Sequence, residues 1–203
     1  MPIIGLTGNF GMGKSTVLQL FNKLGAFTFN ADTFVHNILE NPRIIRRISK
    51  VLGREILTGS AKNISINKKR MADIIFTDPH KRQAVESIIH PEVLKLFKLA
   101  AADLQRREPT ATIIFEVPLL FEAGYARHFH KTIVVYCTRE TAITRLTRKG
   151  FSRSEIRNRM RAQMPVSEKR THADYLIDNN NGIRKTALQV RNIFHELSAP
   201  ACS

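Results

Sequence analysis

A glycine-rich loop near the start of the chain constrains the fold more than any other feature. Residues 8–15 read Gly-Asn-Phe-Gly-Met-Gly-Lys-Ser, which fits the pattern G-x-x-x-x-G-K-[ST] without a mismatch. The apolar run at residues 3–6 predicts a buried strand before the loop, and the apolar spacing of residues 15–24 predicts a helix that stops at Gly25. A strand, such a loop and a helix, in that order, are typical of a phosphate-binding site.

The residue types in the loop match the chemistry of nucleotide phosphates. Glycines let the backbone approach the phosphates, and the loop N–H groups and the helix N-terminus supply partial positive charge. The Lys14 side chain would reach the β- and γ-phosphates, and the Ser15 hydroxyl is placed to ligate Mg²⁺. A glycine-rich turn that binds nothing is the weaker alternative. The predicted nucleotide-binding residues of the loop are Gly11, Met12, Gly13, Lys14, Ser15 and Thr16.

The rest of the chain alternates strand and helix patterns. Four further apolar runs predict strands at residues 27–29, 112–117, 132–137 and 175–177. Helices are expected at residues 139–149, 154–164 and 183–197, and residues 43–107 show mostly helical periodicity with breaks at Gly53, Gly59 and Pro79. Pro91 lies inside the long apolar pattern and should kink or restart its helix. This order indicates an α/β chain whose five-stranded parallel sheet is covered on both faces.

Composition excludes several classes of protein. Hydrophobic residues make up 43% of the chain and charged residues 24%, as in soluble globular proteins rather than disordered or collagen-like ones. No apolar run approaches the ~20 residues needed to cross a bilayer, and the first residues lack the pattern of a secretory signal. Cys137 and Cys202 cannot build a disulfide framework. We therefore expect a cytoplasmic protein.

The positive charge of the chain leaves two kinds of partner open. There are 32 Lys and Arg residues against 17 Asp and Glu residues, a formal net charge of +15, and the excess is concentrated in residues 43–107 and 139–172. Such a chain could bind nucleic acid, or it could be an enzyme whose two basic segments close over polyphosphates. A solvated basic surface is the third possibility. No Trp is present and basic and aromatic residues do not interleave, which counts against nucleic acid.

The motifs, taken in order, resemble one family of kinases over nearly the whole chain. The opening Gly5-Leu6-Thr7-Gly8 runs into the phosphate loop, and Asn30-Ala31-Asp32, Ile75-Phe76, Asp78-Pro79 and Ile89-His90-Pro91 follow. Val117-Pro118-Leu119-Leu120-Phe121-Glu122, Arg145 with Arg148, Gln163, Ala173-Asp174 and Ile177-Asp178-Asn179 complete the set. In this combination the chain is similar to the dephospho-coenzyme A kinases.

The resemblance implies transfer of the γ-phosphoryl group of ATP to the ribose 3′-hydroxyl of dephospho-CoA, the last step of coenzyme A synthesis. It implies ATP and dephospho-CoA as substrates and Mg²⁺ as a cofactor. We expect no nucleic-acid or membrane partner, and the sequence leaves open whether the protein is a monomer or a small homo-oligomer. It also implies a three-layer P-loop kinase core within a single domain of residues 1–203. The core would comprise about residues 1–40, 108–138 and 173–198, with a helical substrate domain at about 41–107 and a lid at about 139–172.

By the same resemblance, several residues receive roles that compete with simpler ones. Asp32 would be the general base, or else the N-cap of the next helix. Arg145 and Arg148 share a helix face and would contact the transferring phosphates, or else only solvent. Asn179 follows the last strand and would contact adenine, or else form a turn. The substrate-binding residues implied are Asp32, Phe76, His90, Pro91, Leu119 and Leu120, although His90-Pro91 equally reads as a helix interruption.

This chain departs from the usual family pattern at a few positions. Asn30 stands where an Asp is usual, and Glu116 stands where an Asp often precedes the Val-Pro-Leu-Leu motif, so a metal role for Glu116 is in doubt. Asn9, Phe10 and Met12 replace usual loop residues without removing a required glycine. Two rival functions stay open at this point: a nucleoside monophosphate kinase, which also uses a phosphate loop and lid arginines, and an ATP-responsive nucleic-acid-binding protein.

Overall fold

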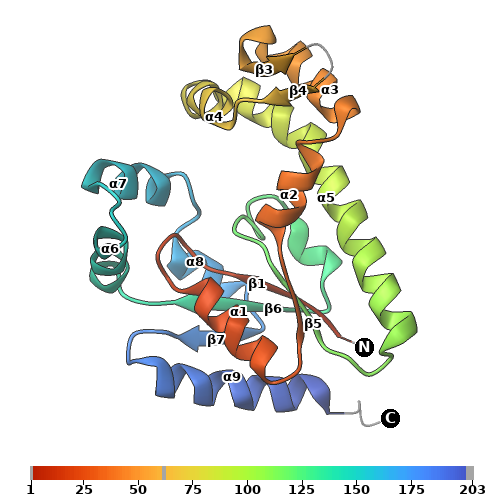
Figure 1. Cartoon of the computed structure of the whole chain (residues 1–203). Coiled ribbons are helices and arrows are strands. Elements are labelled where there is room, and N and C mark those ends of the chain that lie inside the picture. Colours follow the sequence, from red (N-terminus) through yellow and green to blue (C-terminus); the bar gives the residue numbers. More distant parts are fainter. Residues whose placement is uncertain (1, 61–62, 200–203) are drawn as a thin grey trace. The chain divides into compact units, whose positions relative to one another are not determined.

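The computed structural model describes residues 2–60 and 63–199, and they form two compact units (Figure 1). The first unit combines the chain up to residue 30 with the chain from residue 103 onward. The second unit comprises residues 31–102. Each unit is built around its own elements and is described separately below.

The first unit contains the five-stranded parallel sheet that the sequence predicts. Its strands lie in the order β2 (Phe27–Asn30), β5 (Ile113–Glu116), β1 (Ile3–Thr7), β6 (Lys131–Tyr136) and β7 (Tyr175–Asp178). Every neighbouring pair is parallel, so the carboxyl ends of all five strands meet at one edge. The central strand β1 leads directly into the glycine-rich loop, which therefore lies at that edge.

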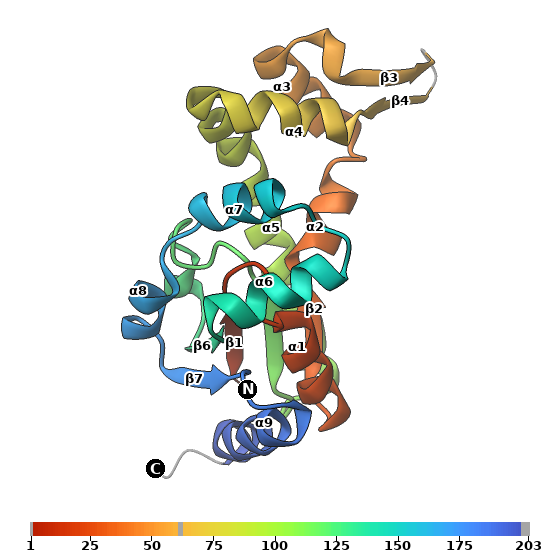
Figure 2. The ribbon, with the colours of Figure 1, turned by 90° about the vertical axis from the view of Figure 1, so that its left-hand side faces the viewer.

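One face of the sheet is covered by two helices, α1 (Lys14–Lys23) and α9 (Ile183–Ser198), which lie side by side in Figures 1 and 2. Alternate strand residues such as Ile4 and Leu6 pack here against Phe21 of α1 and Val190 of α9. All four side chains are buried. Successive residues of a strand point to opposite faces of the sheet. Because both faces of this sheet are covered, residues on both are apolar, and the strands appear in the sequence as nearly continuous apolar runs.

The opposite face of the sheet is covered by the segment between β5 and β6, which includes the short 3₁₀ helix η2 (Tyr125–His128). Gly5 of β1 faces this side, and a side chain there would meet Leu120 and Phe129, each 3.0 Å from the position of a Cβ atom. Phe115 packs beside Phe129, with 6.1 Å between the ring centroids. The glycine thus leaves space for two large side chains to lie flat on the sheet.

Three helices follow β6: α6 (Arg139–Arg148), α7 (Arg153–Arg161) and α8 (Val166–Thr171). Thr138 caps α6, and Ser152 and Glu155 form a capping box at the start of α7. The helix expected at residues 154–164 ends earlier than predicted, at Arg161, and α8 was not predicted. Pro165 occupies the N-cap position of α8. A proline is tolerated there because the backbone N–H group that it lacks would have no partner within the helix.

The second unit is helical apart from one hairpin. It contains α2 (Ala31–Ile38), α3 (Pro42–Leu52), the 3₁₀ helix η1 (Arg54–Ile56), α4 (Lys68–Thr77) and most of α5 (Pro79–Arg107). The antiparallel pair β3 (Leu57–Ser60) and β4 (Asn63–Ile66) was missed, because four-residue strands with polar alternation carry little signal in a helical region. The break predicted at Gly59 falls within β3.

Helix α5 runs without a break through Pro91, so of the two outcomes expected there, a kink or a restart, the restart is wrong. A proline inside a helix removes one backbone hydrogen bond and crowds the preceding turn. Here buried side chains on both sides of it, Ile88 before and Val93 after, keep the helix packed. Tertiary packing of the apolar stripe outweighs the local cost of the proline.

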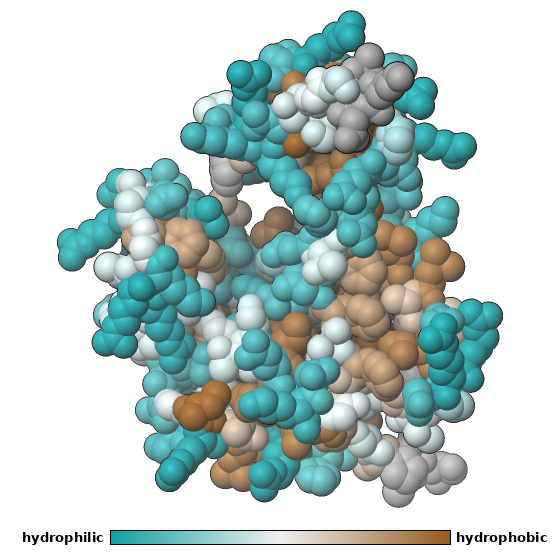
Figure 3. Space-filling model, in the orientation of Figure 1, coloured by the Kyte–Doolittle hydropathy of each residue, from teal (hydrophilic) through white to brown (hydrophobic). Residues whose placement is uncertain are grey.

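Hydrophilic side chains cover much of the face drawn in Figure 3, with smaller hydrophobic areas between them. The large hydrophobic side chains that are exposed come from several separate elements, among them Phe27 of β2, Leu99 of α5 and Leu188 of α9. In the described part of the chain, no helix combines the length and the apolar character that a membrane span requires.

Candidate functional site

The glycine-rich loop is enclosed so tightly that three of its positions accept only glycine. At Gly8, with φ of 152°, a Cβ atom would lie 2.3 Å from the Val135 carbonyl oxygen. Gly13 has φ of 92°, and a Cβ atom there would lie 2.0 Å from Nδ2 of Asn179. Gly11 has φ of 84°, and its Cβ would lie 2.7 Å from Cδ1 of Leu146 in α6. The loop therefore sits between α6 and the turn after β7, with its backbone in direct contact with both.

The first turn of α1 begins immediately after the loop. Lys14 is its first residue, and the preceding Gly13 offers no side chain to cap the N–H groups of that turn. Ser15 and Thr16 follow and are exposed. An anion bound in the loop would accept hydrogen bonds from these N–H groups and would lie at the positive end of the helix dipole.

Met12 differs from the other predicted nucleotide-binding residues. Its N–H group donates to the Asn9 carbonyl over 3.2 Å, and its side chain packs in a small buried cluster with Cys137 and Ala142. The Met12 side chain thus anchors the loop in this buried cluster. Burial raises the pKa of the Cys137 thiol, an effect that Arg145 opposes and Asp178 reinforces. Cys137 is a core residue, as its position in an apolar strand predicted.

Asn179 supports the phosphate loop through hydrogen bonds of its side-chain amide. Its Nδ2 donates to the Met12 carbonyl over 2.9 Å, and its Oδ1 accepts from the Thr186 hydroxyl over 3.0 Å. Asn179 is buried. Both ends of its amide are therefore occupied within the protein, an arrangement that supports the loop and goes beyond a simple turn.

The two arginines predicted to contact phosphates have different environments. Arg145 donates through Nη2 to the Asn179 carbonyl over 2.7 Å, and its buried Nη1 has no hydrogen-bond partner within residues 2–60 and 63–199. Nη1 lies 3.7 Å from the place where a Cβ of Gly13 would be. Arg148, one turn further along α6, is exposed. The structure thus places Arg145 beside the loop, whereas Arg148 is exposed on the same helix.

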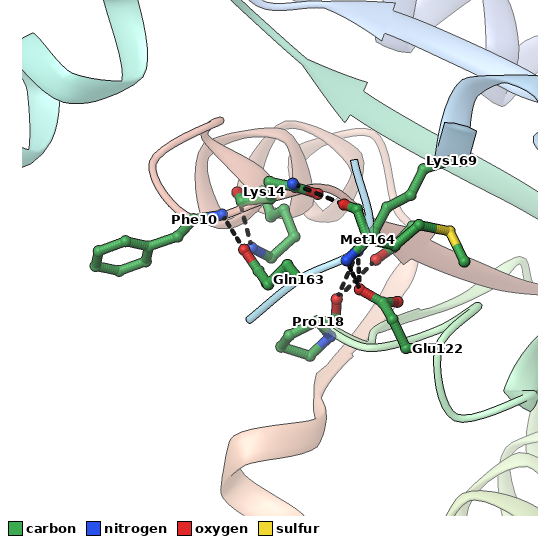
Figure 4. A network of polar contacts seen from close by, with 9 residues as sticks. Phe10, Lys14, Pro118, Glu122, Gln163, Met164 and Lys169 are labelled. Carbon is green, nitrogen blue, oxygen red and sulfur yellow. Dashed lines mark hydrogen bonds and ion pairs between the residues drawn. The ribbon is translucent and has the colours of Figure 1, made fainter. Parts of the chain in front are cut away.

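Side chains from the α7–α8 segment hold the middle of the loop (Figure 4). The Phe10 N–H group donates to Oε1 of Gln163 over 2.8 Å, and Asn9 Nδ2 donates to the Met164 carbonyl over 3.0 Å. Lys14 Nζ lies 3.5 Å from the Asn9 carbonyl. Two of the residues that depart from the usual family pattern, Asn9 and Phe10, therefore tie the loop to this segment.

Phe10 also makes a contact that the sequence did not indicate. Its ring lies edge-on to the ring of Phe151, with centroids 5.1 Å apart. The Arg159 guanidinium carbon lies 5.0 Å from the centroid of the Phe10 ring and 5.1 Å from that of Phe151. Such cation–π contacts orient an otherwise mobile side chain. No periodicity distinguishes Arg159 from its arginine neighbours in α7.

A carboxylate and an amide meet at the same edge of the sheet. The strand register pairs Leu6 with Glu116 and Glu116 with Asn30, and Asn30 Nδ2 donates to Glu116 Oε2 over 3.2 Å. Glu116 is only 4% exposed. Asn30 thus places a neutral amide against the buried Glu116 carboxylate, where an Asp would place a second carboxylate that repels it.

Asp32 is the second residue of α2, two residues beyond the end of β2. It is exposed and lies within the first turn of the helix. It therefore does not occupy the N-cap position that precedes a helix, and that alternative is set aside.

The predicted substrate-binding residues fall into different environments. Leu120 is fully buried against Gly5 on the sheet, where it serves the core, whereas Leu119 is only partly buried. His90 lies next to Pro91 inside α5; partial burial lowers its pKa, and the Glu86 carboxylate opposes that shift. The side chain of Phe76 lies outside the described residues.

The loop suits a nucleotide by two observations. Gly11 and Gly13 have positive φ values that let the loop backbone turn tightly, and the buried Arg145 Nη1 beside Gly13 offers a donor for an anion. Within the described ranges no group of three or more His, Cys, Asp or Glu side chains could hold a metal. Mg²⁺ bound with a nucleotide keeps water and phosphate ligands and needs only one or two from the protein, which Ser15 can supply.

The parallel sheet and the loop between its central strand and the following helix define a P-loop kinase. A model of the dephospho-CoA kinase family matches residues 2–185. The chain belongs to the dephospho-CoA kinase family. Members of this family catalyse the last step of coenzyme A biosynthesis, the phosphorylation of dephospho-CoA by ATP, so the resemblance read from the motifs is confirmed.

Individual relatives agree with this assignment. A dephospho-CoA kinase of Aquifex aeolicus is 36% identical over 199 residues, which cover 98% of each chain. The crystal structure of a Thermus thermophilus protein matches with a TM-score of 0.82 at 32% identity, over 98% of each chain. A dephospho-CoA kinase structure from Campylobacter jejuni matches with a TM-score of 0.69 at 25% identity, over 97% of this chain and 96% of that one.

Proposed function

We propose that the chain transfers the γ-phosphoryl group of ATP to the ribose 3′-hydroxyl of dephospho-CoA, with the loop between β1 and α1 as the ATP site. The observation that carries this site is the buried Nη1 of Arg145, which lies beside Gly13 without a hydrogen-bond partner in the described structure. A buried guanidinium donor favours an anionic partner, and a nucleotide phosphate in the loop would supply one.

Lys14 and Arg145 would stabilise the charge that develops on the transferring group. In a loose phosphoryl-transfer transition state, negative charge spreads over the equatorial oxygens, so fixed positive groups at the loop lower the barrier. Lys14 stands at the junction of loop and helix, and Arg145 is held by the Asn179 carbonyl. Arg148, exposed on the same helix, would join them from the proposed lid of residues 139–172.

Ser15 is the residue that would hold Mg²⁺, through its hydroxyl. When bound, the metal ion would offset the negative charge of the phosphates. The N–H groups of Gly11, Gly13, Ser15 and Thr16 would bind the remaining phosphate oxygens along the loop and the first turn of α1.

Asp32 would act as the general base that accepts the proton of the 3′-hydroxyl. It follows β2 at the carboxyl edge of the sheet, where ligands bind in open α/β folds, and it is exposed. Dephospho-CoA would be bound by the helical segment of about residues 41–107, including His90 and Pro91, and by Leu119. We further propose a cytoplasmic enzyme that is a monomer or a small homo-oligomer.

Two substitutions test this assignment of roles. Asp32→Asn is expected to lower the turnover of dephospho-CoA while it leaves ADP affinity within about twofold of wild type, because only the base is lost. Lys14→Ala is expected to lower turnover by about 10²-fold or more, because it removes a charge contact of the transition state. Titration calorimetry with ADP and steady-state kinetics separate the two effects. Near-normal turnover of Lys14→Ala would overturn the ATP site, and joint loss of fold and ADP binding in Asp32→Asn would make Asp32 structural.

A further inference from the structure

Lys169 is the one feature of the lid segment that the reaction, as derived above, leaves unused. It lies in α8, whose sequence Val-Ser-Glu-Lys-Arg-Thr is mostly polar, yet its side chain is 0% exposed. A lysine is almost never fully buried unless it is paired, because removal of its charge from water is costly. The location of its partners therefore indicates what the burial achieves.

The ammonium group of Lys169 joins two points of the segment that follows β5. Nζ lies 2.8 Å from Glu122 Oε1 and donates to the Pro118 carbonyl over 3.2 Å. The same carbonyl accepts from the hydroxyl of Thr7, the last residue of β1 before the loop, over 3.2 Å. Lys169 is thus linked to the start of the phosphate loop through one shared acceptor.

The same ion pair also reaches the middle of the loop. Glu122 Oε1 accepts from the Met164 N–H group over 3.1 Å, and the Met164 carbonyl accepts from Asn9 Nδ2 over 3.0 Å. The neighbouring Gln163 accepts from the Phe10 N–H group over 2.8 Å. Figure 4 shows these links converging on the segment between α7 and α8. Asn9 in turn presents its carbonyl to Lys14 Nζ, over 3.5 Å.

We propose that Lys169 is a positioning residue for phosphoryl transfer, which acts through Glu122 and the Gln163–Met164 segment to hold the phosphate loop and Lys14 in place. The inference rests on the proposed ATP site. The buried ammonium contacts the Pro118 carbonyl and Glu122 directly, and these two acceptors in turn bind Thr7 at the end of β1 and Met164 between α7 and α8. Removal of the ammonium is therefore expected to loosen both attachments of the loop. A buried pair that served only to anchor α8 would change stability without changing the loop.

Lys169→Met in the full chain tests this directly, because methionine keeps the apolar length of the side chain and removes its charge and donors. The double variant Lys169→Met/Glu122→Gln avoids a Glu122 carboxylate that has lost its counter-charge. Lys131→Met is the control for loss of a lysine ion pair, since it breaks a more exposed Lys–Asp pair of the same unit, with Asp174 at 3.0 Å, at the start of β6. ADP affinity by calorimetry, amide exchange of Phe10 and thermal unfolding are measured for each.

At a temperature where each variant is folded, both Lys169 variants are expected to bind ADP at least about tenfold more weakly and to exchange the Phe10 amide faster, whereas Lys131→Met matches wild type. Wild-type ADP affinity and Phe10 exchange in the Lys169 variants would overturn the proposal, as would equal changes in Lys131→Met.

Gln163→Leu covers the case in which the Lys169 variants do not fold. It removes only the hydrogen bond to the Phe10 N–H group and leaves the buried pair intact. Faster Phe10 exchange with weaker ADP binding is expected, and wild-type values for both would overturn the proposal. None of these measurements needs an acceptor substrate. A wild-type protein that binds ADP but does not phosphorylate dephospho-CoA would therefore refute the proposed function and leave this test valid.

Discussion

At Gly13 and Gly25, two glycines with nearly the same backbone conformation have opposite surroundings. Both have φ near +100°, at 92° and 100°. A Cβ at Gly13 would collide with Asn179, whereas nothing lies within 4 Å of a Cβ at Gly25. The pair separates the cost of a left-handed backbone from the cost of filling the space behind the phosphate loop.

Gly13→Ala is expected to destabilise the fold and to abolish measurable ADP binding, because Asn179 must move and the loop with it. Gly25→Ala should cost about 1–2 kcal/mol of unfolding free energy, from backbone strain alone, and keep wild-type ADP affinity. Urea unfolding and ADP calorimetry on both variants check this. Wild-type ADP affinity in Gly13→Ala would contradict the geometry assigned to the loop.

Individual site residues differ in how far the sequence could predict them. The loop residues and Arg145 were predicted, because the pattern G-x-x-x-x-G-K-S and a helix after β6 place them without tertiary knowledge. Lys169 and Glu122 were not, since a lysine in a polar helix of six residues reads as solvent-exposed. Its burial depends on a carboxylate 47 positions earlier in the chain, Glu122. Leu120 was assigned to substrate, but its side chain packs on Gly5 within the core.

Among the elements, strand β1 contains a glycine, Gly5, over which large side chains pack closely on one face of the sheet. Gly5 has no side chain, and Leu120 and Phe129 occupy the space above it. Gly5→Ala is expected to lower the unfolding free energy by about 1–3 kcal/mol, because the added methyl group would crowd the side chains of Leu120 and Phe129. The urea midpoint measures this effect. An unchanged or higher midpoint would show that the covering segment is loosely packed.

Long apolar strands and capped helices were predictable, whereas short elements were not. The three central strands, β1, β5 and β6, show up as apolar runs because their side chains are mostly buried on both faces, whereas the edge strands β2 and β7 are only partly buried. The hairpin β3–β4 and helix α8 are too short and too polar for such a pattern, and they depend on contacts with residues distant in sequence. Helix α5 shows the opposite failure, since a strong local signal, Pro91, was outweighed by its buried stripe.

For the whole molecule, pH dependence of stability follows from two groups with lowered pKa values. Partial burial lowers the pKa of His90, so the unfolded chain binds this proton at higher pH than the folded one. Burial alone would raise the pKa of Asp174, but hydrogen bonds from Lys131 and Thr132 hold it below its usual value. Both groups therefore stabilise the fold above their unfolded pKa values, near 6.5 and 3.8, and that stability is lost as the pH falls through them.

His90→Gln is expected to flatten the loss of stability between pH 7 and pH 5, because a residue that does not titrate imposes no cost of charging. The Asp174 contribution, at lower pH, should be unchanged. Urea midpoints of wild type and variant at pH 7 and pH 5 measure the difference. An identical decline in both proteins would mean that His90 does not titrate differently on unfolding.

The central claim about the whole molecule is its choice of acceptor, and a coupled ADP-release assay with Mg-ATP tests it most directly. Dephospho-CoA is compared with AMP, CMP, UMP and GMP at equal concentrations, and the product is identified by mass spectrometry. We predict turnover with dephospho-CoA, coenzyme A as the product, and background rates with the four monophosphates. Turnover with a monophosphate and none with dephospho-CoA would contradict the proposed function while it preserves the fold and the ATP site.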